Sequence, residues 1–264
     1  PGQQLVSFGG ASINENSFIV NGLNITNLRD MMGSSFVPLE FVQEVQIKTG
    51  GYEAEYRSSL GGTVNVVTYS GSNRVVGQAF GFFTNNTLTA TPRSVPDSPN
   101  TGDFERWDVG FGVGGPIQKD RLWYYAAYNP VFQTEDVEIP GFGFYDDDLT
   151  THSFAGKLTW RTNDKNTLTL TGIADPTEGL AVRPPIVTPE NIDPFLSRLR
   201  SGGLGVMLEG RHLVSDNLFF KSSISWLRRD DENLPDTERG EELNFLVDST
   251  GVESGGVFET ADNN

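Results

Sequence analysis

Apolar and polar residues alternate with a period of two along much of this sequence, and the clearest run extends from Phe104 to Gly114. One set of alternate positions is apolar, and the other is charged or glycine: Trp107, Val109, Phe111 and Val113 against Arg106, Asp108, Gly110, Gly112 and Gly114. Because successive side chains of a strand point to opposite faces, this pattern predicts a strand between two unlike environments. Similar patterns predict seven strands in all, near 76–84, 104–114, 121–129, 154–161, 167–171, 203–209 and 218–226.

The connections between these predicted strands alternate in length. Short connections rich in Gly, Asn, Asp and Ser, typical of tight turns, cover 114–120, 162–166 and 214–217. Long proline-containing segments, expected to be loops, cover 85–103, 130–151 and 175–201. This alternation is typical of an outer-membrane β-barrel, which has tight turns at the periplasmic rim and long loops at the extracellular rim.

The net charge of -16 excludes nucleic acid as a default partner, because binding to phosphates requires a basic surface. The acidic residues are concentrated in two segments outside the predicted strands. Residues 132–151 contain six acidic and no basic residues, and residues 228–264 contain eleven acidic residues and three arginines. We therefore expect these two segments to be solvated.

The sequence has no cysteine, which excludes disulfides and thiolate metal sites. It also has no run of eighteen apolar residues, which excludes a transmembrane helix but not a transmembrane barrel. All four tryptophans fall in predicted strands, as amphipathic rings do at a membrane interface. The same alternation is compatible with a soluble β-sandwich in which these rings fill the core.

The pattern changes before Arg74. Shorter strands are predicted at 17–20, 45–49 and 63–68, an Asn21-Gly22 turn follows the first of them, and Pro38 precedes a helical turn. We therefore predict two parts with a boundary near 69–74: a small α+β portion over 1–73 and an all-β portion over 74–264.

One long motif lies in the first part, from Phe41 to Thr68: FVQEVQIKTGGYEAEYRSSLGGTVNVVT. It closely resembles the end of the plug domain of TonB-dependent outer-membrane receptors, in the version of the Oar-like branch. Supporting matches are Gly10-Ala11-Ser12, Glu15-Asn16, Asn21-Gly22-Leu23-Asn24, Gly114-Gly115-Pro116-Ile117 and Lys119-Asp120-Arg121-Leu122-Trp123. The resemblance covers most of residues 1–175.

The resemblance implies a plugged, antiparallel transmembrane barrel, with 22 strands in the complete protein. Residues 1–73 would then be the C-terminal portion of the plug, and 74–264 the first barrel strands with their extracellular loops. The remaining strands are expected downstream, and the segment that contacts the TonB-type energy transducer is expected before Pro1.

The resemblance also implies candidate gating residues in the plug motif: Glu44, Lys48, Gly50, Gly51, Tyr52, Glu53, Glu55, Tyr56, Arg57, Gly61, Gly62 and Asn65. Two positions depart from the family pattern. Thr49 stands where the general pattern has Arg, and Arg57 stands where the family usually has Gly. Both departures affect residues expected to lock the plug to the barrel.

The function implied is energy-coupled transport of a ligand across the outer membrane of a Gram-negative bacterium, by plug movement driven through TonB. The implied partners are that transducer, outer-membrane lipid and lipopolysaccharide, accessory outer-membrane proteins, and a peptide or protein as one ligand class. Two alternatives stay open: an Oar-like surface or export-related assembly protein without nutrient uptake, and a soluble secreted β-sandwich that binds a partner through acidic loops.

No enzyme, cofactor or metal site is predicted. Gly110–Gly115 fits a dinucleotide-binding fingerprint, but Pro116 follows it where a helix should begin. The run Asp146–Asp148 lacks the ligand spacing of a calcium loop. His152 and His212 lie sixty residues apart with no catalytic pattern nearby.

Overall fold

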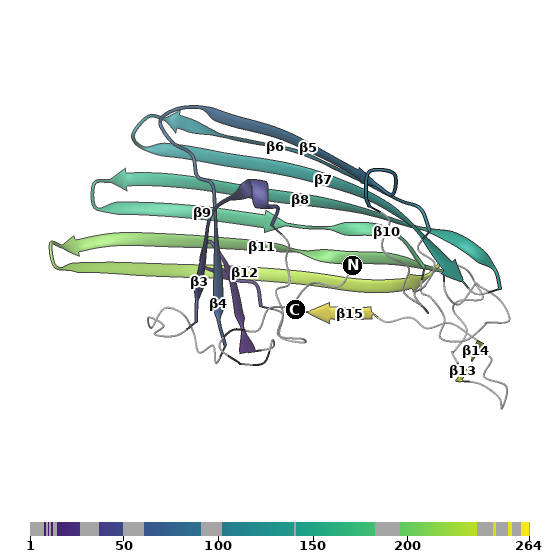
Figure 1. Ribbon diagram of the computed structural model, residues 1–264. Helices are drawn as coiled ribbons and strands as arrows, with labels where there is room; N and C mark the ends of the chain where they lie inside the picture. Colours follow the sequence, from purple (N-terminus) through teal and green to yellow (C-terminus); the bar gives the residue numbers. More distant parts are fainter. Residues whose placement is uncertain are drawn as a thin grey trace.

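The fold consists of a small sheet standing against one face of a large sheet in a computed structural model (Figure 1). The structure describes residues 8, 10, 12, 15–26, 37–49, 61–90, 102–139, 141–182, 196–236, 245–246, 253–254 and 260–263. Among these residues, no helix is long and apolar enough to cross a membrane.

The small sheet has four strands in the order β2-β1-β4-β3. They are β1 (Ser17–Val20), β2 (Leu23–Asn24), β3 (Val42–Lys48) and β4 (Thr63–Thr68), with a 3-10 turn, η2, at Leu39–Phe41. β1 pairs with β4 in parallel, and the other pairs are antiparallel. The predicted Asn21-Gly22 turn is confirmed. Both residues have positive φ, which asparagine and glycine tolerate best.

The large sheet is antiparallel and has the order β15-β12-β11-β10-β8-β7-β6-β5, with β9 between β8 and β11. Its strands are β5 (Val76–Asn85), β6 (Phe104–Gln118), β7 (Leu122–Ile139), β8 (Gly143–Asn163), β9 (Asn166–Ala174), β10 (Thr177–Val182), β11 (Leu196–Ser215), β12 (Leu218–Pro235) and β15 (Thr260–Asn263). β9 and β10 keep one register against β8 and β11, so they act as one strand interrupted at Asp175-Pro176. A separate two-stranded sheet joins β13 (Phe245–Leu246) to β14 (Glu253–Ser254).

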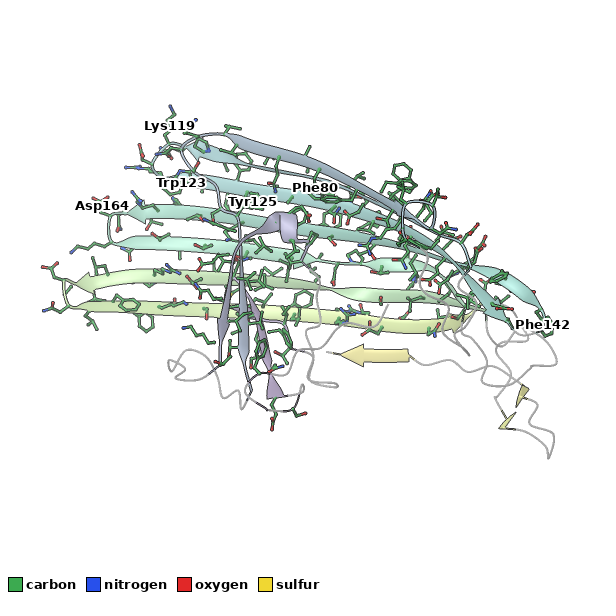
Figure 2. All side chains as sticks on the ribbon, viewed as in Figure 1. Phe80, Lys119, Trp123, Tyr125, Phe142 and Asp164 are labelled. Carbon is green, nitrogen blue, oxygen red and sulfur yellow. The ribbon has the colours of Figure 1, made fainter. Side chains whose placement is uncertain are left out.

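All seven predicted strands are present, and the three predicted tight turns lie together at one end of the sheet. Figure 2 labels Lys119 and Asp164 at this end and Phe142 at the opposite end. We call the first end the turn rim and the second the loop rim.

The two faces of the large sheet differ as the alternation predicted. The inward face, toward the small sheet, carries buried small or polar residues such as Ala127, Ser153 and Thr171. The outward face carries exposed large apolar residues: Trp107, Val109, Phe111, Phe154, Leu158, Trp160, Leu170, Leu204, Leu208, Phe220, Ile224 and Trp226. We call this set the outward band. A soluble sandwich would bury such residues, whereas a transmembrane barrel turns them to lipid, so the sandwich alternative is wrong.

Two of the predicted long loops are also wrong in part. β7 and β8 stay paired to Ile139↔Gly143, so residues 130–139 and 143–151 are strand rather than loop. Likewise 177–182 and 196–201 belong to β10 and β11. The length and the prolines of these segments predicted loops, but a hairpin that continues beyond the membrane meets water on both faces and needs no alternation. The predicted loop 85–103 falls mostly outside the described residues.

Pro130 was expected to exclude a central strand, yet it lies inside β7. The β6–β7 ladder is interrupted there, between the pairs Asp108↔Val131 and Phe111↔Tyr128. The side chain of Asn129 supplies hydrogen-bond donors in this gap: its Nδ2 donates to the Val109 carbonyl at 2.8 Å and to Asp108 Oδ1 at 2.7 Å. A side-chain amide thus compensates for the amide hydrogen that proline lacks.

Replacing Asn129 by alanine is expected to destabilise the barrel by about 1–3 kcal/mol, because buried acceptors lose their donor. Ser153→Ala is the matched control, since Ser153 is a buried inward residue whose Oγ has no hydrogen-bond partner among the described residues. The measurement is the midpoint temperature at which the full-length receptor in detergent loses its compact electrophoretic mobility. Equal midpoints for the two variants would contradict this account of the interruption.

Candidate functional site

The small sheet and the inward face share one apolar core. Val20, Leu23, Ile25 and Phe41 from the small sheet cluster with Tyr125, Ala127, Ala155, Ile173 and Met207 from the large sheet. The approach is close at Gly205 of β11, where an added Cβ would lie 2.5 Å from Leu23 Cδ2. Glycine allows this close approach, because a side chain here would have to displace the end of the Leu23 side chain.

Lys157 makes a polar connection between the two sheets through three hydrogen bonds. This residue of β8 is buried, and its Nζ donates to Asn21 Oδ1 at 2.9 Å, to the Thr68 carbonyl at 2.9 Å and to Ser70 Oγ at 3.1 Å. An ammonium group has three donors, and all three are used on the small sheet and the segment that follows it. Asn21 is held in turn by Thr68, whose N–H donates to Asn21 Oδ1.

A polar cavity of about 980 Å³ lies beside this contact, between the small sheet and the wall of β8, β9, β11 and β12. We call it the seam cavity. Threonines cover much of its wall, namely Thr159, Thr167, Thr169 and Thr171, while Asn21, Gln46 and Asn65 line it from the small sheet. The polar lining makes the seam cavity suited to water and to polar solutes.

A charged group forms one side of the seam cavity. Glu209 of β11 is buried. Its carboxylate accepts a hydrogen bond from Arg211 Nε at 2.7 Å and forms an ion pair with Lys221 Nζ at 3.3 Å. Pairing with two cations compensates for the loss of water around this carboxylate. Nearer the loop rim, Arg229 lies 3.0 Å from Asp231 and 3.8 Å from Asp175 on the same inward face.

The predicted gating residues divide into two sets. Seven lie outside the described residues: Gly50, Gly51, Tyr52, Glu53, Glu55, Tyr56 and Arg57. The other five are placed, and only Asn65 lines the seam cavity. Its Oδ1 is buried without a hydrogen-bond partner among the described residues, and its Nδ2 donates to Gln46 Oε1 at 3.5 Å.

The remaining four predicted residues lie around the ends of β3 and β4. Glu44 is exposed on β3 and accepts a hydrogen bond from Gln46 Nε2 at 2.9 Å, and Lys48 pairs with Thr63 at the strand end. Gly62 donates its N–H to Asn16 Oδ1 at 2.8 Å. An added Cβ on Gly61 would lie 2.5 Å from the same oxygen, so these glycines permit a close approach to Asn16.

Sequence reasoning missed Lys157, Asn21, Glu209, Arg211 and Lys221 as site residues. A signal was present for three of them: Lys157, Glu209 and Lys221 are charged residues on the polar side of otherwise alternating strands. Asn21 gave none, because its role as a turn residue accounted for it.

The glycine pattern, the aspartate run and the two histidines considered in the sequence have structural roles. The glycines of 110–115 lie along β6 and Asp146–Asp148 lie along β8, as parts of strands. His152 contacts Tyr128 Oη through Nδ1 at 2.8 Å, and His212 contacts Asn166 Oδ1 at 2.7 Å. Within the described ranges, no group of three or more His, Asp or Glu residues is arranged to hold a metal ion.

An outward apolar band and an inward polar wall covered by a second sheet define this protein as the wall of a plugged, antiparallel transmembrane barrel. A family model described as outer membrane beta barrel domain matches residues 67–139. The TonB-dependent transporter Oar of Myxococcus xanthus is 39% identical over 132 residues, which cover 48% of this chain and 12% of that protein.

Further matches agree in fold. The probable TonB-dependent siderophore receptor PirA of Acinetobacter baumannii is 29% identical over 178 residues, 64% of this chain and 22% of that protein. The outer membrane transporter YddB from Escherichia coli matches 95% of this chain and 36% of its own, with a TM-score of 0.74 at 13% identity. A ferric enterobactin receptor mutant from Pseudomonas aeruginosa matches 94% of this chain and 37% of its own, with a TM-score of 0.63 at 16% identity.

The predicted resemblance is therefore confirmed: the chain is related to TonB-dependent outer-membrane receptors of the Oar-like branch, and its location is the outer membrane of a Gram-negative bacterium. The chain spans about one eighth to one fifth of the length of its two named relatives. Those relatives are transporters and receptors rather than enzymes.

Proposed function

We propose that the complete protein is an energy-coupled transporter in which residues 1–73 end the plug and residues 74–264 begin the barrel. TonB would pull on the plug and shift it along the seam cavity, which would widen into a passage. The named relatives, a transporter and a siderophore receptor, support this reading.

The observation that carries the proposal is the polar seam beside Lys157. A plug sealed to the wall by apolar packing alone would expose that surface whenever it moved. Here part of the contact is hydrogen bonds beside a polar cavity, which water can replace as the sheets separate.

The test compares the parent strain, a deletion strain and a complemented strain for uptake of labelled iron-loaded siderophores and labelled peptide digests. Transport is supported if the deletion strain fails to take up one ligand class only. Uptake of that ligand by the parent strain should also stop when the proton-motive force is collapsed. Normal uptake of every probe, together with a changed set of surface or secreted proteins, would instead support the Oar-like assembly alternative.

A disulfide between plug and wall is expected to abolish this uptake. An added Cβ on Gly205 meets Leu23 Cδ2, which is two bonds from the Leu23 Cβ, so Leu23→Cys with Gly205→Cys brings the two sulfur atoms within reach of each other. The chain has no cysteine of its own to interfere. Uptake should fall under oxidation and return with dithiothreitol, while each single variant should not respond. Full uptake by the oxidised double variant would contradict plug movement at this seam.

A further inference from the structure

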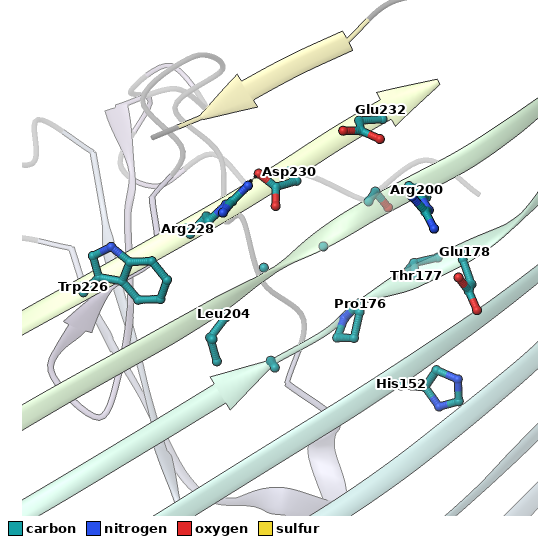
Figure 3. A pocket seen from close by; sticks show the side chains of 14 residues that line it. His152, Pro176, Thr177, Glu178, Arg200, Leu204, Trp226, Arg228, Asp230 and Glu232 are labelled. Atoms are coloured by element: carbon teal, nitrogen blue, oxygen red, sulfur yellow. Dashed lines mark hydrogen bonds and ion pairs between the residues drawn. The ribbon is translucent and has the colours of Figure 1, made fainter. Parts of the chain in front are cut away.

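Residues 70–75, which we call the linker, join the end of β4 to the start of β5 at the turn rim (Figure 1). Two motifs of the sequence, 114–117 and 119–123, lie around the turn between β6 and β7 at the same rim, where Figure 2 labels Lys119 and Trp123. The hollow of about 710 Å³ in Figure 3 lies between β8 and β12, nearer the loop rim, and is a separate feature. The linker and the two motifs therefore meet at one place on the wall.

The side chain of Asn73 connects the linker to the β6–β7 turn. Its Oδ1 accepts hydrogen bonds from the Asp120 N–H at 2.9 Å and from Trp123 Nε1 at 2.7 Å, and its Nδ2 donates to Asp120 Oδ1. Asp120 has a φ of +63°, a conformation that aspartate tolerates in tight turns. The Trp123 ring is contacted by Arg161, whose Cζ lies 5.4 Å from the ring centroid. The amide of Asn73 thus bonds to the turn through both its oxygen and its nitrogen.

The backbone of the linker lies directly on β6 and β7 at Gly71. An added Cβ there would collide with the Tyr124 carbonyl oxygen, and it would lie 2.8 Å from the Tyr124 nitrogen and 2.9 Å from the Gly115 carbonyl oxygen. These are backbone atoms of paired strands, so they cannot turn aside as the end of a side chain can. Gly115 also makes room for Val75, because an added Cβ on Gly115 would lie 2.9 Å from Val75 Cγ2. We call the wall residues of this contact the linker seat: Gly115, Asp120, Trp123 and Tyr124.

The contacts with the wall change in kind between Ser70 and Gly71. Up to Ser70 they include hydrogen bonds from Lys157 Nζ, a flexible side chain, to the Thr68 carbonyl and Ser70 Oγ. Ser70 lines the seam cavity, where water can replace these bonds. From Gly71 onward the linker lies on strand backbone and on the β6–β7 turn. The chain before Gly71 can therefore leave the wall while the linker stays on it.

We propose that the linker seat is a fixed hinge, which keeps residues 71–75 on the turn rim while the plug moves and so limits how far the plug can leave the wall. Asn73 is the positioning residue of this hinge. The inference rests on the proposed function, because it requires a plug that TonB pulls. Without the seat, the same pull would peel the linker from the rim and open the lumen to solutes larger than the ligand.

The experiment measures vancomycin sensitivity of cells that produce the full-length receptor, in one strain with TonB and in one without it. Asn73→Ala removes all three hydrogen bonds and is expected to raise sensitivity roughly tenfold in cells with TonB. In cells without TonB it should have no effect, because nothing pulls on the plug. Ser72→Ala is the matched control, since Ser72 Oγ bonds to Arg74 within the linker itself, and it should stay resistant in both strains.

A cross-link provides a second variant that restores the contact. Asn73→Cys with Asp120→Cys should leak in cells with TonB until a short bifunctional maleimide joins the two thiols. The cross-linked receptor should regain resistance to vancomycin and keep its energy-dependent uptake. The chain has no cysteine of its own to compete for the reagent. Heat-shifted mobility verifies that each variant is folded.

The hinge is overturned if N73A leaks equally with and without TonB, because Asn73 would then only stabilise the resting plug. It is also overturned if the cross-link stops uptake, since the linker would have to leave its seat during transport. Resistance of N73A equal to that of S72A, in a receptor whose uptake is energy-dependent, overturns the hinge alone. A receptor without energy-dependent uptake overturns the proposed function, and the hinge with it.

Discussion

Replacing Lys157 by methionine is expected to loosen the plug and make the outer membrane permeable to large antibiotics. Methionine keeps most of the apolar stem but removes all three hydrogen bonds to Asn21, Thr68 and Ser70. Hydrogen bonds from a charged donor contribute about 1.5–3 kcal/mol each, so the variant should weaken the plug–wall contact by roughly 3 kcal/mol or more. The measurements are vancomycin sensitivity of cells and protease cleavage within residues 1–73.

Lys165→Met is the matched control, because Lys165 is an exposed lysine in the β8–β9 turn. It loses the same charge without touching the plug. If K157M and K165M were equally resistant to vancomycin and to protease, Lys157 would not hold the plug, and the apolar core around Leu23 and Phe41 would have to do so alone.

The fold of the barrel wall could be predicted because the residues of each strand show which face meets an apolar environment and which meets a polar one. On β6, Trp107 and Phe111 face outward while Asp108 and Gly112 face inward, and the alternation is visible within the strand itself. The ends of the strands could not be predicted in this way. Beyond the membrane both faces meet water, the alternation disappears, and β7 and β8 continue through acidic residues that resemble a loop.

The candidate site was harder to predict from the sequence, because its contacts join segments that are far apart along the chain. Lys157 and Asn21 are 136 residues apart, and a lysine on the polar side of a strand has several possible partners in a barrel lumen. The plug motif instead drew attention to twelve residues within 44–65, and of the five that the structure describes only Asn65 lines the seam cavity. The resemblance to the family pointed to the loop motif. The contact between Lys157 and Asn21, in contrast, depends on how the two sheets meet in space.

Replacing Ile224 by arginine is expected to prevent assembly of the receptor in the outer membrane. Ile224 is 72% exposed on the outward face of β12, between Phe220 and Trp226 and opposite Leu208. An arginine on the lipid face near the middle of a barrel costs about 2–4 kcal/mol. The expected result is loss of the heat-modifiable form from the outer-membrane fraction, measured by comparing boiled and unboiled samples.

The neighbouring substitution Ser225→Arg separates a lipid-facing effect from a general effect of charge. Ser225 pairs with Met207, a buried residue of the inward face, so its side chain points into the lumen. S225R should assemble normally, because an arginine there remains in a polar environment. Failure of both variants would indicate that β12 tolerates no arginine on either face. Normal assembly of I224R would mean that the outward band of β12 does not face lipid.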